Sequence, residues 1–93
     1  MEDEHSIYIG QKPFMNYVTS VVVQFTTKGA EEVTIKARGK FIARAVDVAE
    51  VAQNRFLKDK ITVKDIRISS EEFKNQEDRE VRVSTIEIIL SKI

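Results

Sequence analysis

The sequence predicts an α+β fold, a two-layer sandwich in which two helices cover one face of a four-stranded mixed sheet. Segments with strand-like and helix-like spacing of apolar residues follow each other in the order β-α-β-α-β-β. Each of the first two strands is followed by a helix, and such units make parallel strands with right-handed crossovers. The last two strands follow each other directly, so we expect a long antiparallel hairpin.

The first half of the chain supplies a strand, a helix and a second strand. Residues 6–9 alternate in polarity, and after a turn Pro13 marks the start of a helix, where a missing N–H costs nothing. Apolar residues then recur at helical spacing as far as Phe25, and Gly29 is a typical signal that a helix has ended. Residues 32–38 alternate again, which predicts the second strand.

The second half predicts a long helix over residues 40–57 and two more strands. Residues 61–68 form the third strand, and a slip in its alternation near Asp65 predicts a bulge. Residues 71–80 are polar and turn-like, and residues 81–90 form the fourth strand. The apolar stripe of the long helix is assigned to Ile42, Val46, Ala49 and Phe56, widened by Ala45 and Ala52.

Length and composition predict one domain without catalytic chemistry. We expect residues 1–5 to be an acidic, flexible N-terminus and residues 6–93 to form a single domain. The chain has no cysteine, and its one histidine, His5, falls in the expected tail, which argues against a metal site or a histidine base. No phosphate-binding glycine motif occurs, and no apolar run is long enough to predict a membrane span. We therefore expect a binding protein with no cofactor.

A short basic segment is the strongest indication of a ligand. In residues 35–40, alternation places Lys36 and Arg38 on one strand face, Gly39 lets the chain turn, and Lys40 opens a helix. The alternative for this segment alone is a solvated strand end. The chain is neutral overall, but residues 10–44 carry six cations against two anions, a net charge of +4. A basic patch on one face is what nucleic-acid binding requires.

The predicted topology brings a second segment beside the first. The carboxyl ends of parallel strands meet at one edge of a sheet, so Lys12 should join Arg38, Lys40 and Arg44 beside two helix N-termini. Asn16 and Tyr17 could add hydrogen bonds. The alternatives are a cap in the first helical turn for Asn16, and a packed helix residue with its hydroxyl at the rim for Tyr17.

The polar segment between the last two strands leaves two possibilities. Long hairpins can reach into a groove of a duplex, and Lys74, Arg79 and Arg82 would suit that role. Residues 71–80, however, carry five anions against two cations, a net charge of −3 that phosphates should repel. A solvated loop is therefore favoured over a binding arm.

Residues 10–18, 35–40, 54–56 and 82–88 together resemble the Alba family, small archaeal chromatin proteins that bind DNA and RNA. The resemblance implies a fold similar to the C-terminal domain of translation initiation factor three. It also implies a homodimer that places two basic patches and two hairpin arms along a duplex.

Residue roles follow from the resemblance as expectations. Lys12, Arg38 and Lys40 match the family's phosphate-contacting positions, and Asn16 and Tyr17 match its loop-helix contact region. The full set of nucleic-acid contacts that we expect is Gln11, Lys12, Asn16, Tyr17, Lys36, Arg38, Gly39, Lys40, Arg44 and Arg82.

Two further positions carry expectations of their own. Phe56 matches an aromatic residue used for contacts between dimers on DNA. Members of the family often have a Lys-Lys pair in the first turn, where this chain has Gln11-Lys12 and therefore one cation fewer. Regulation by lysine acetylation, an idea attached to the family, cannot act at residue 11.

We therefore expect a non-enzymatic protein of the cytoplasm, associated with the chromosome, that coats or compacts duplex DNA as a dimer with little sequence preference. The first alternative is an RNA-binding chaperone or an accessory subunit of the ribonuclease P type. The alternative from another class is a protein–protein scaffold whose basic patch meets an acidic partner. The residues do not rank DNA above RNA.

Overall fold

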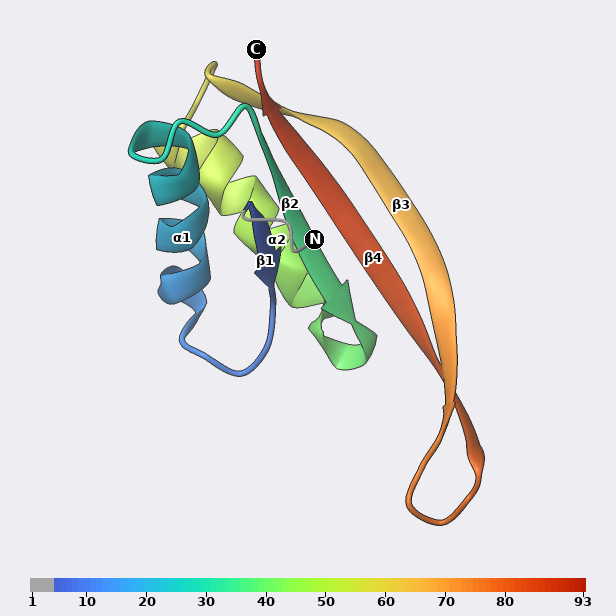
Figure 1. Ribbon diagram of the computed structural model, residues 1–93. Helices are drawn as coiled ribbons and strands as arrows, with labels where there is room; N and C mark the ends of the chain where they lie inside the picture. Colours follow the sequence, from blue (N-terminus) through green and yellow to red (C-terminus); the bar gives the residue numbers. More distant parts are fainter. Residues whose placement is uncertain (1–4) are drawn as a thin grey trace.

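The structure is a computed structural model that describes residues 5–93; residues 1–4, most of the expected acidic N-terminus, lie outside the described part. The elements follow the predicted order (Figure 1). They are β1 (Ser6–Tyr8), α1 (Phe14–Thr26), β2 (Glu32–Arg38), α2 (Ile42–Val51), β3 (Ile61–Lys74) and β4 (Glu80–Lys92).

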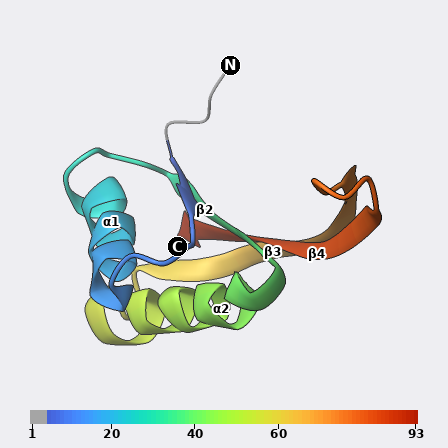
Figure 2. The same ribbon diagram turned by 90° about the horizontal axis from the view of Figure 1, so that it is seen from below.

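The four strands form one mixed sheet in the order β1-β2-β4-β3. Strands β1 and β2 are parallel, whereas β2 with β4 and β4 with β3 are antiparallel. Both helices lie on one face of this sheet, and the other face has no helix over it (Figures 1 and 2). The predicted α+β fold and its parallel first pair of strands are confirmed.

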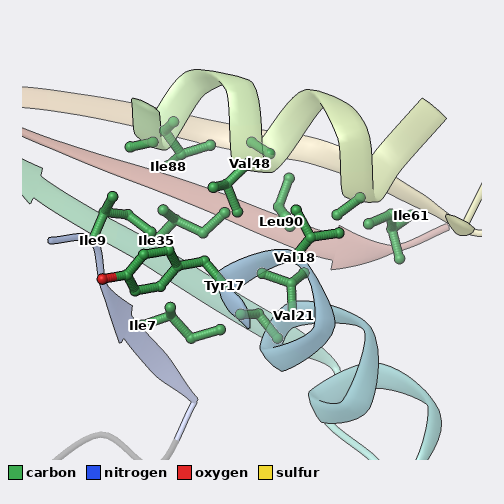
Figure 3. Packing of buried hydrophobic residues seen from close by; sticks show 14 of the residues in the cluster. Ile7, Ile9, Tyr17, Val18, Val21, Ile35, Val48, Ile61, Ile88 and Leu90 are labelled. Atoms are coloured by element: carbon green, nitrogen blue, oxygen red, sulfur yellow. The ribbon is translucent and has the colours of Figure 1, made fainter. Parts of the chain in front are cut away.

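The core lies between the helices and the sheet. In β2, Val33, Ile35 and Ala37 are buried beneath the helices, while the alternate residues, which include Lys36 and Arg38, face the other way. Val18 of α1 and Val48 of α2 pack in the same cluster (Figure 3). Full burial of a valine or isoleucine side chain contributes about 1.5–3 kcal/mol to folding. Turning β2 over would expose these side chains, so its alternation fixes which face remains available for a ligand.

The helix expected over residues 40–57 is divided into three parts, and its apolar stripe was partly wrong. A 3-10 turn, Gly39–Phe41, precedes α2, and a π-helical turn, Ala52–Phe56, follows it. Val46 and Phe56 are 43% and 50% exposed. Ala45, Ala49 and Ala52 are buried as predicted, and Val48 and Leu57 occupy the core in place of Val46 and Phe56.

The physical reason is helical spacing and the wider last turn. Ala45, Val48, Ala49 and Ala52 lie at i, i+3, i+4 and i+7, so they share the helix face that packs on the sheet, and Val46 is turned toward solvent. In the π-helical turn, the N–H of Leu57 bonds the carbonyl of Ala52 over 2.9 Å. This extra residue in the turn brings Leu57, rather than Phe56, against the core.

The final hairpin extends well beyond the strands that the sequence predicted. Residues 71–80 are not turn-like throughout, because β3 continues to Lys74, which pairs with Glu80, and only residues 75–79 connect the strands. A two-stranded arm in solvent needs backbone pairing but no apolar face, so its charges did not prevent strand formation. The arm extends away from the helices (Figure 1) and lengthens the molecule to 46 Å. The predicted bulge is confirmed by the register shift between Val63 and Asp65.

The N-terminal boundary of the fold lies earlier than expected. His5 Nδ1 lies 2.6 Å from Gln24 Oε1, and the His5 carbonyl accepts a hydrogen bond from the N–H of Thr34 over 3.0 Å. The expectation that His5 belongs to a flexible tail is therefore wrong. Over residues 5–93, no helix has both the length and the apolar character needed to cross a membrane.

Candidate nucleic-acid interface

The loop between β1 and α1 is fixed by two side chains from the helices. The hydroxyl of Tyr17 accepts hydrogen bonds from the N–H groups of Gly10 and Lys12, over 2.9 and 3.0 Å. Arg44 Nη2 donates to the carbonyl of Lys12 over 2.8 Å, and its guanidinium lies 5.9 Å from the Tyr17 ring centroid. The loop backbone is thus tied to both helices, while the side chain of Lys12 remains exposed.

The turn after β2 requires glycine. Gly39 has a φ of +58°, and a Cβ at this position would lie 3.1 Å from a methyl group of Val83. Both features favour a residue without a side chain. Arg38 and Lys40, on either side of the turn, are exposed. The turn therefore presents two cations at the end of β2.

The predicted basic residues meet at this edge of the molecule. Lys36, Arg38 and Lys40 line one surface hollow, and Lys12 and Asn16 line a second. Tyr8 lines both hollows. The bond from Arg44 to Lys12 joins α2 to the first loop in the same region. Here the structure brings together cations from three separate segments of the chain.

The nearby helix starts are open to an anion. Among residues 5–93, neither Pro13 before α1 nor Arg38 before the 3-10 turn that leads into α2 makes a side-chain cap, and neither first turn contains an acidic residue. The unpaired N–H groups of a first turn and the helix dipole favour a negative charge. No group of three acidic or histidine side chains within the described region could hold a metal ion.

Three further predicted site residues, Gln11, Arg82 and Phe56, line neither of these two hollows. Gln11 is exposed in the first loop beside Lys12. Arg82 lies on β4 with its Nε 3.3 Å from Ser70 Oγ, and it lines a different hollow from that of Arg38. Phe56 is half exposed at the far end of the second helical segment. The basic patch is therefore defined by Lys12, Lys36, Arg38 and Lys40.

The sequence did not indicate two residues that border this patch. Glu71 on β3 places Oε1 3.1 Å from Arg38 Nη1, with both side chains more than half exposed. Extending the register of the hairpin would have found it, because Glu71 pairs with Val83, the residue that meets Gly39. Tyr8 could have been found from its place at the end of β1 between Ile7 and Ile9, because alternation turns it away from the core.

Comparison with known proteins places the chain in a family. The model of the Alba family matches residues 5–70. The chain is 55% identical to "DNA/RNA-binding protein Alba 1" of Archaeoglobus fulgidus, over 96% of this chain and 97% of the relative. It is 53% identical to "DNA/RNA-binding protein Alba" of Methanothrix thermoacetophila, over 99% of this chain and the whole relative.

Solved structures agree with this result. Alba from Thermoplasma volcanium superposes with a TM-score of 0.84 at 44% identity, over 92% of this chain and 98% of that one. An Alba protein from Trypanosoma brucei, at 24% identity, has a TM-score of 0.76 over 99% of this chain and 72% of its own, and shows likeness of fold alone. From the family model and the close relatives, the chain belongs to the Alba family.

Proposed function

We propose that this protein binds DNA and RNA through their phosphate backbones, with little sequence preference, and coats or compacts duplex DNA as a homodimer. The observation that carries the proposal is the basic patch, in which Lys12 from the first loop joins Arg38 and Lys40 from the turn after β2 at one edge of the sheet. Phosphate contacts of this kind supply affinity without reading base sequence. The relatives named above are described as DNA/RNA-binding proteins, and such members of the family are non-enzymatic.

Roles within the site divide into contact and positioning. Lys12, Arg38 and Lys40 contact phosphates, with Lys36 and Asn16 beside them. Tyr17 and Arg44 are also predicted contacts, but their bonds to the first loop support a positioning role, because they fix the backbone that carries Lys12. Gly39 sets the turn that carries the other two cations.

An exposed apolar surface on β3 supports the homodimer in this proposal. Strand β3 is at the edge of the sheet, and its Ile66 and Ile68 are 54% and 80% exposed. Exposed apolar side chains on a strand whose outer edge has no neighbouring strand favour association with another chain. A second copy of the chain would bring a second basic patch to the same duplex.

A paired titration tests the proposed function against the scaffold alternative. Duplex DNA and a structured RNA are titrated with the protein at one stated salt concentration, and complexes are resolved on a native gel. The proposal predicts that both nucleic acids shift and that an unrelated duplex sequence of equal length shifts equally. Absence of a shift at low salt would contradict nucleic-acid binding and favour a scaffold.

A further inference from the structure

The sheet face without helices carries an exposed aromatic side chain at its edge. Tyr8 on β1 is 68% exposed, whereas its neighbours Ile7 and Ile9 are buried. Across the strand pair Tyr8 lies opposite Lys36, whose ammonium is 5.5 Å from the centre of the tyrosine ring. A ring in this place adds nothing to the core, so its exposure calls for another explanation.

The sheet register extends Tyr8 into a row of polar residues across all four strands. Lys36 on β2 pairs with Glu87 on β4, and Glu87 pairs with Arg67 on β3. Paired residues share a face of the sheet, so this row lies on the face opposite the helices (Figure 2). The row offers one flat ring, two cations and one hydrogen-bond acceptor to a ligand lying across the strands.

The two surface hollows of the basic patch lie on either side of Tyr8. One hollow is lined by Tyr8 together with Lys36, Arg38 and Lys40, and the other by Tyr8 together with Lys12 and Asn16. A chain of phosphates that followed the basic patch would therefore pass the ring on its way from one hollow to the other. Asp65, which lies 3.1 Å from Arg67, adds a third carboxylate to Glu71 and Glu87. The five cations, Arg67 and the four of the basic patch, still outnumber these three, which favours a polyanion over an acidic or apolar peptide segment.

An exposed aromatic ring among cations suits unpaired bases. Bases stack on aromatic side chains when they are free of a duplex, and every base has a face that can do so. In a duplex the base faces are covered by their neighbours, so the ring gains nothing there. We propose that Tyr8 is a stacking platform for an unpaired base of single-stranded nucleic acid, whose phosphates contact Lys36 and the other cations of the basic patch.

This inference rests on the proposed function and adds a second mode to it. The same cations serve a duplex and a single strand, but only the single strand uses Tyr8. The flexible Lys36 side chain, now over the ring, is within reach of the phosphate of a base stacked there. Single-stranded RNA and single-stranded DNA both have the required base and phosphate.

The test compares Tyr8→Ala with Tyr8→Phe, which keeps the ring and loses the hydroxyl. Fluorescence anisotropy is measured with a short oligouridylate, an oligothymidylate of equal length and a short duplex DNA, all at the same salt. Tyr8→Ala should bind the single strands roughly five- to hundred-fold more weakly than wild type, as expected for one lost stacking contact per binding site. Its affinity for the duplex should stay within about two-fold. Tyr8→Phe should match wild type on all three probes.

A spectroscopic measurement reports stacking directly. The chain has no tryptophan, so Tyr8→Trp introduces a single one at an exposed position. Single strands should quench its emission, and the duplex should leave it nearly unchanged. Equal quenching by duplex and single strand would overturn a stacking site.

Other outcomes separate this inference from the proposed function. If wild type binds the duplex and Tyr8→Ala binds every single strand as wild type does, the stacking site is wrong and the proposed function stands. If wild type binds neither single strands nor duplex, both are wrong. If Tyr8→Ala changes self-association in sedimentation, or weakens duplex and single strand equally, Tyr8 is a subunit or general contact and the inference fails.

Discussion

Several side chains that resemble ligand contacts in the sequence act, in the structure, on the protein's own backbone. Tyr17 is only 7% exposed, and its hydroxyl accepts two backbone hydrogen bonds from the loop that carries Lys12. Arg44 donates to the same loop. Alternation and helical spacing place such residues at the correct edge, but they do not reveal whether a hydroxyl or a guanidinium meets a phosphate or a carbonyl. That distinction depends on how closely the loop passes the helices.

We expect Glu71 to compete with nucleic acid for Arg38. Their ion pair, with oxygen and nitrogen 3.1 Å apart, must open before Arg38 contacts a phosphate. Exposed pairs of this kind are worth at most about 1 kcal/mol. Glu71→Gln should therefore tighten duplex binding at low salt by up to about five-fold.

Glu72→Gln is the matched control for this change. It removes the same charge from the next residue of β3. Glu72 pairs with Arg82, and because consecutive strand residues face opposite sides of the sheet, Glu72 lies on the other face from Glu71. The prediction is that Glu71→Gln gains more affinity than Glu72→Gln in a fluorescence titration. Equal gains would mean that the general charge of the arm matters and the ion pair does not.

Residue 11 should tune affinity because it is exposed beside Lys12. Gln11→Lys restores a cation and adds up to two phosphate contacts for each dimer. Binding to duplex DNA should be tighter at low salt and should converge with wild type at high salt, where the charges are screened. Thr27→Lys, which adds the same charge at the exposed far end of α1, controls for net charge. No gain of Gln11→Lys over this control would show that residue 11 points away from the ligand.

At the scale of whole elements, apolar spacing predicted every helix and strand but not every face. Strand β2 was read correctly because alternation leaves only two faces, and large β-branched residues occupy one of them. The second helix was misread in part: its buried alanines were assigned to the stripe, but Val46 was chosen in place of the buried Val48, because both valines fit a helical spacing with those alanines. The π-helical turn has no spacing signature in the sequence, and it places Leu57, in place of the predicted Phe56, in the core.

Phe56 separates folding from assembly on DNA. Its side chain is 50% exposed, so Phe56→Ala should keep the melting temperature within a few degrees and leave the isolated dimer intact. If it packs between dimers, the variant should coat long DNA less cooperatively while keeping its affinity for a short duplex. A thermal melt and isotherms on short and long duplexes measure these two effects.

The neighbouring Leu57→Ala supplies the contrast for that experiment. Leu57 is buried, and the loss of a buried leucine costs about 2–5 kcal/mol, so this variant should melt at a clearly lower temperature. A similar drop for Phe56→Ala would identify Phe56 as a core residue and remove its role in assembly.

The cations of the hairpin arm lie beside carboxylates of the same arm. Lys74 lies 3.7 Å from Asp78 and Arg79 lies 3.8 Å from Glu77, so the two cations of residues 71–80 are both beside carboxylates. An arm of this composition gives phosphates little attraction. The expectation that it contributes less to binding than the basic patch remains a prediction, because charge can be read from the sequence but contact with a duplex cannot.

For the whole molecule, the neutral net charge hides how the cations are distributed. Lys12 comes from the first loop, whereas Lys36, Arg38 and Lys40 come from β2 and the turn that follows it, so two segments distant in the sequence are adjacent in the fold. The sequence could predict this gathering because parallel strands end at a common edge. The prediction missed Glu71 because it ended the third strand at residue 68, whereas the contact with Arg38 requires the strand and its register to continue into the arm.

The salt dependence of duplex binding tests the central claim, that the basic patch binds phosphates. If Lys12, Arg38 and Lys40 each contact one phosphate, a dimer neutralises about six phosphates. The logarithm of the binding constant should then fall with the logarithm of the salt concentration with a slope of about −5. Lys40→Ala should flatten the slope to about −3.5 and weaken all sequences alike. Lys28→Ala, which removes the same charge beyond the end of α1, should keep the wild-type slope. A wild-type slope near zero, or equal slopes for Lys40→Ala and Lys28→Ala, would contradict the account.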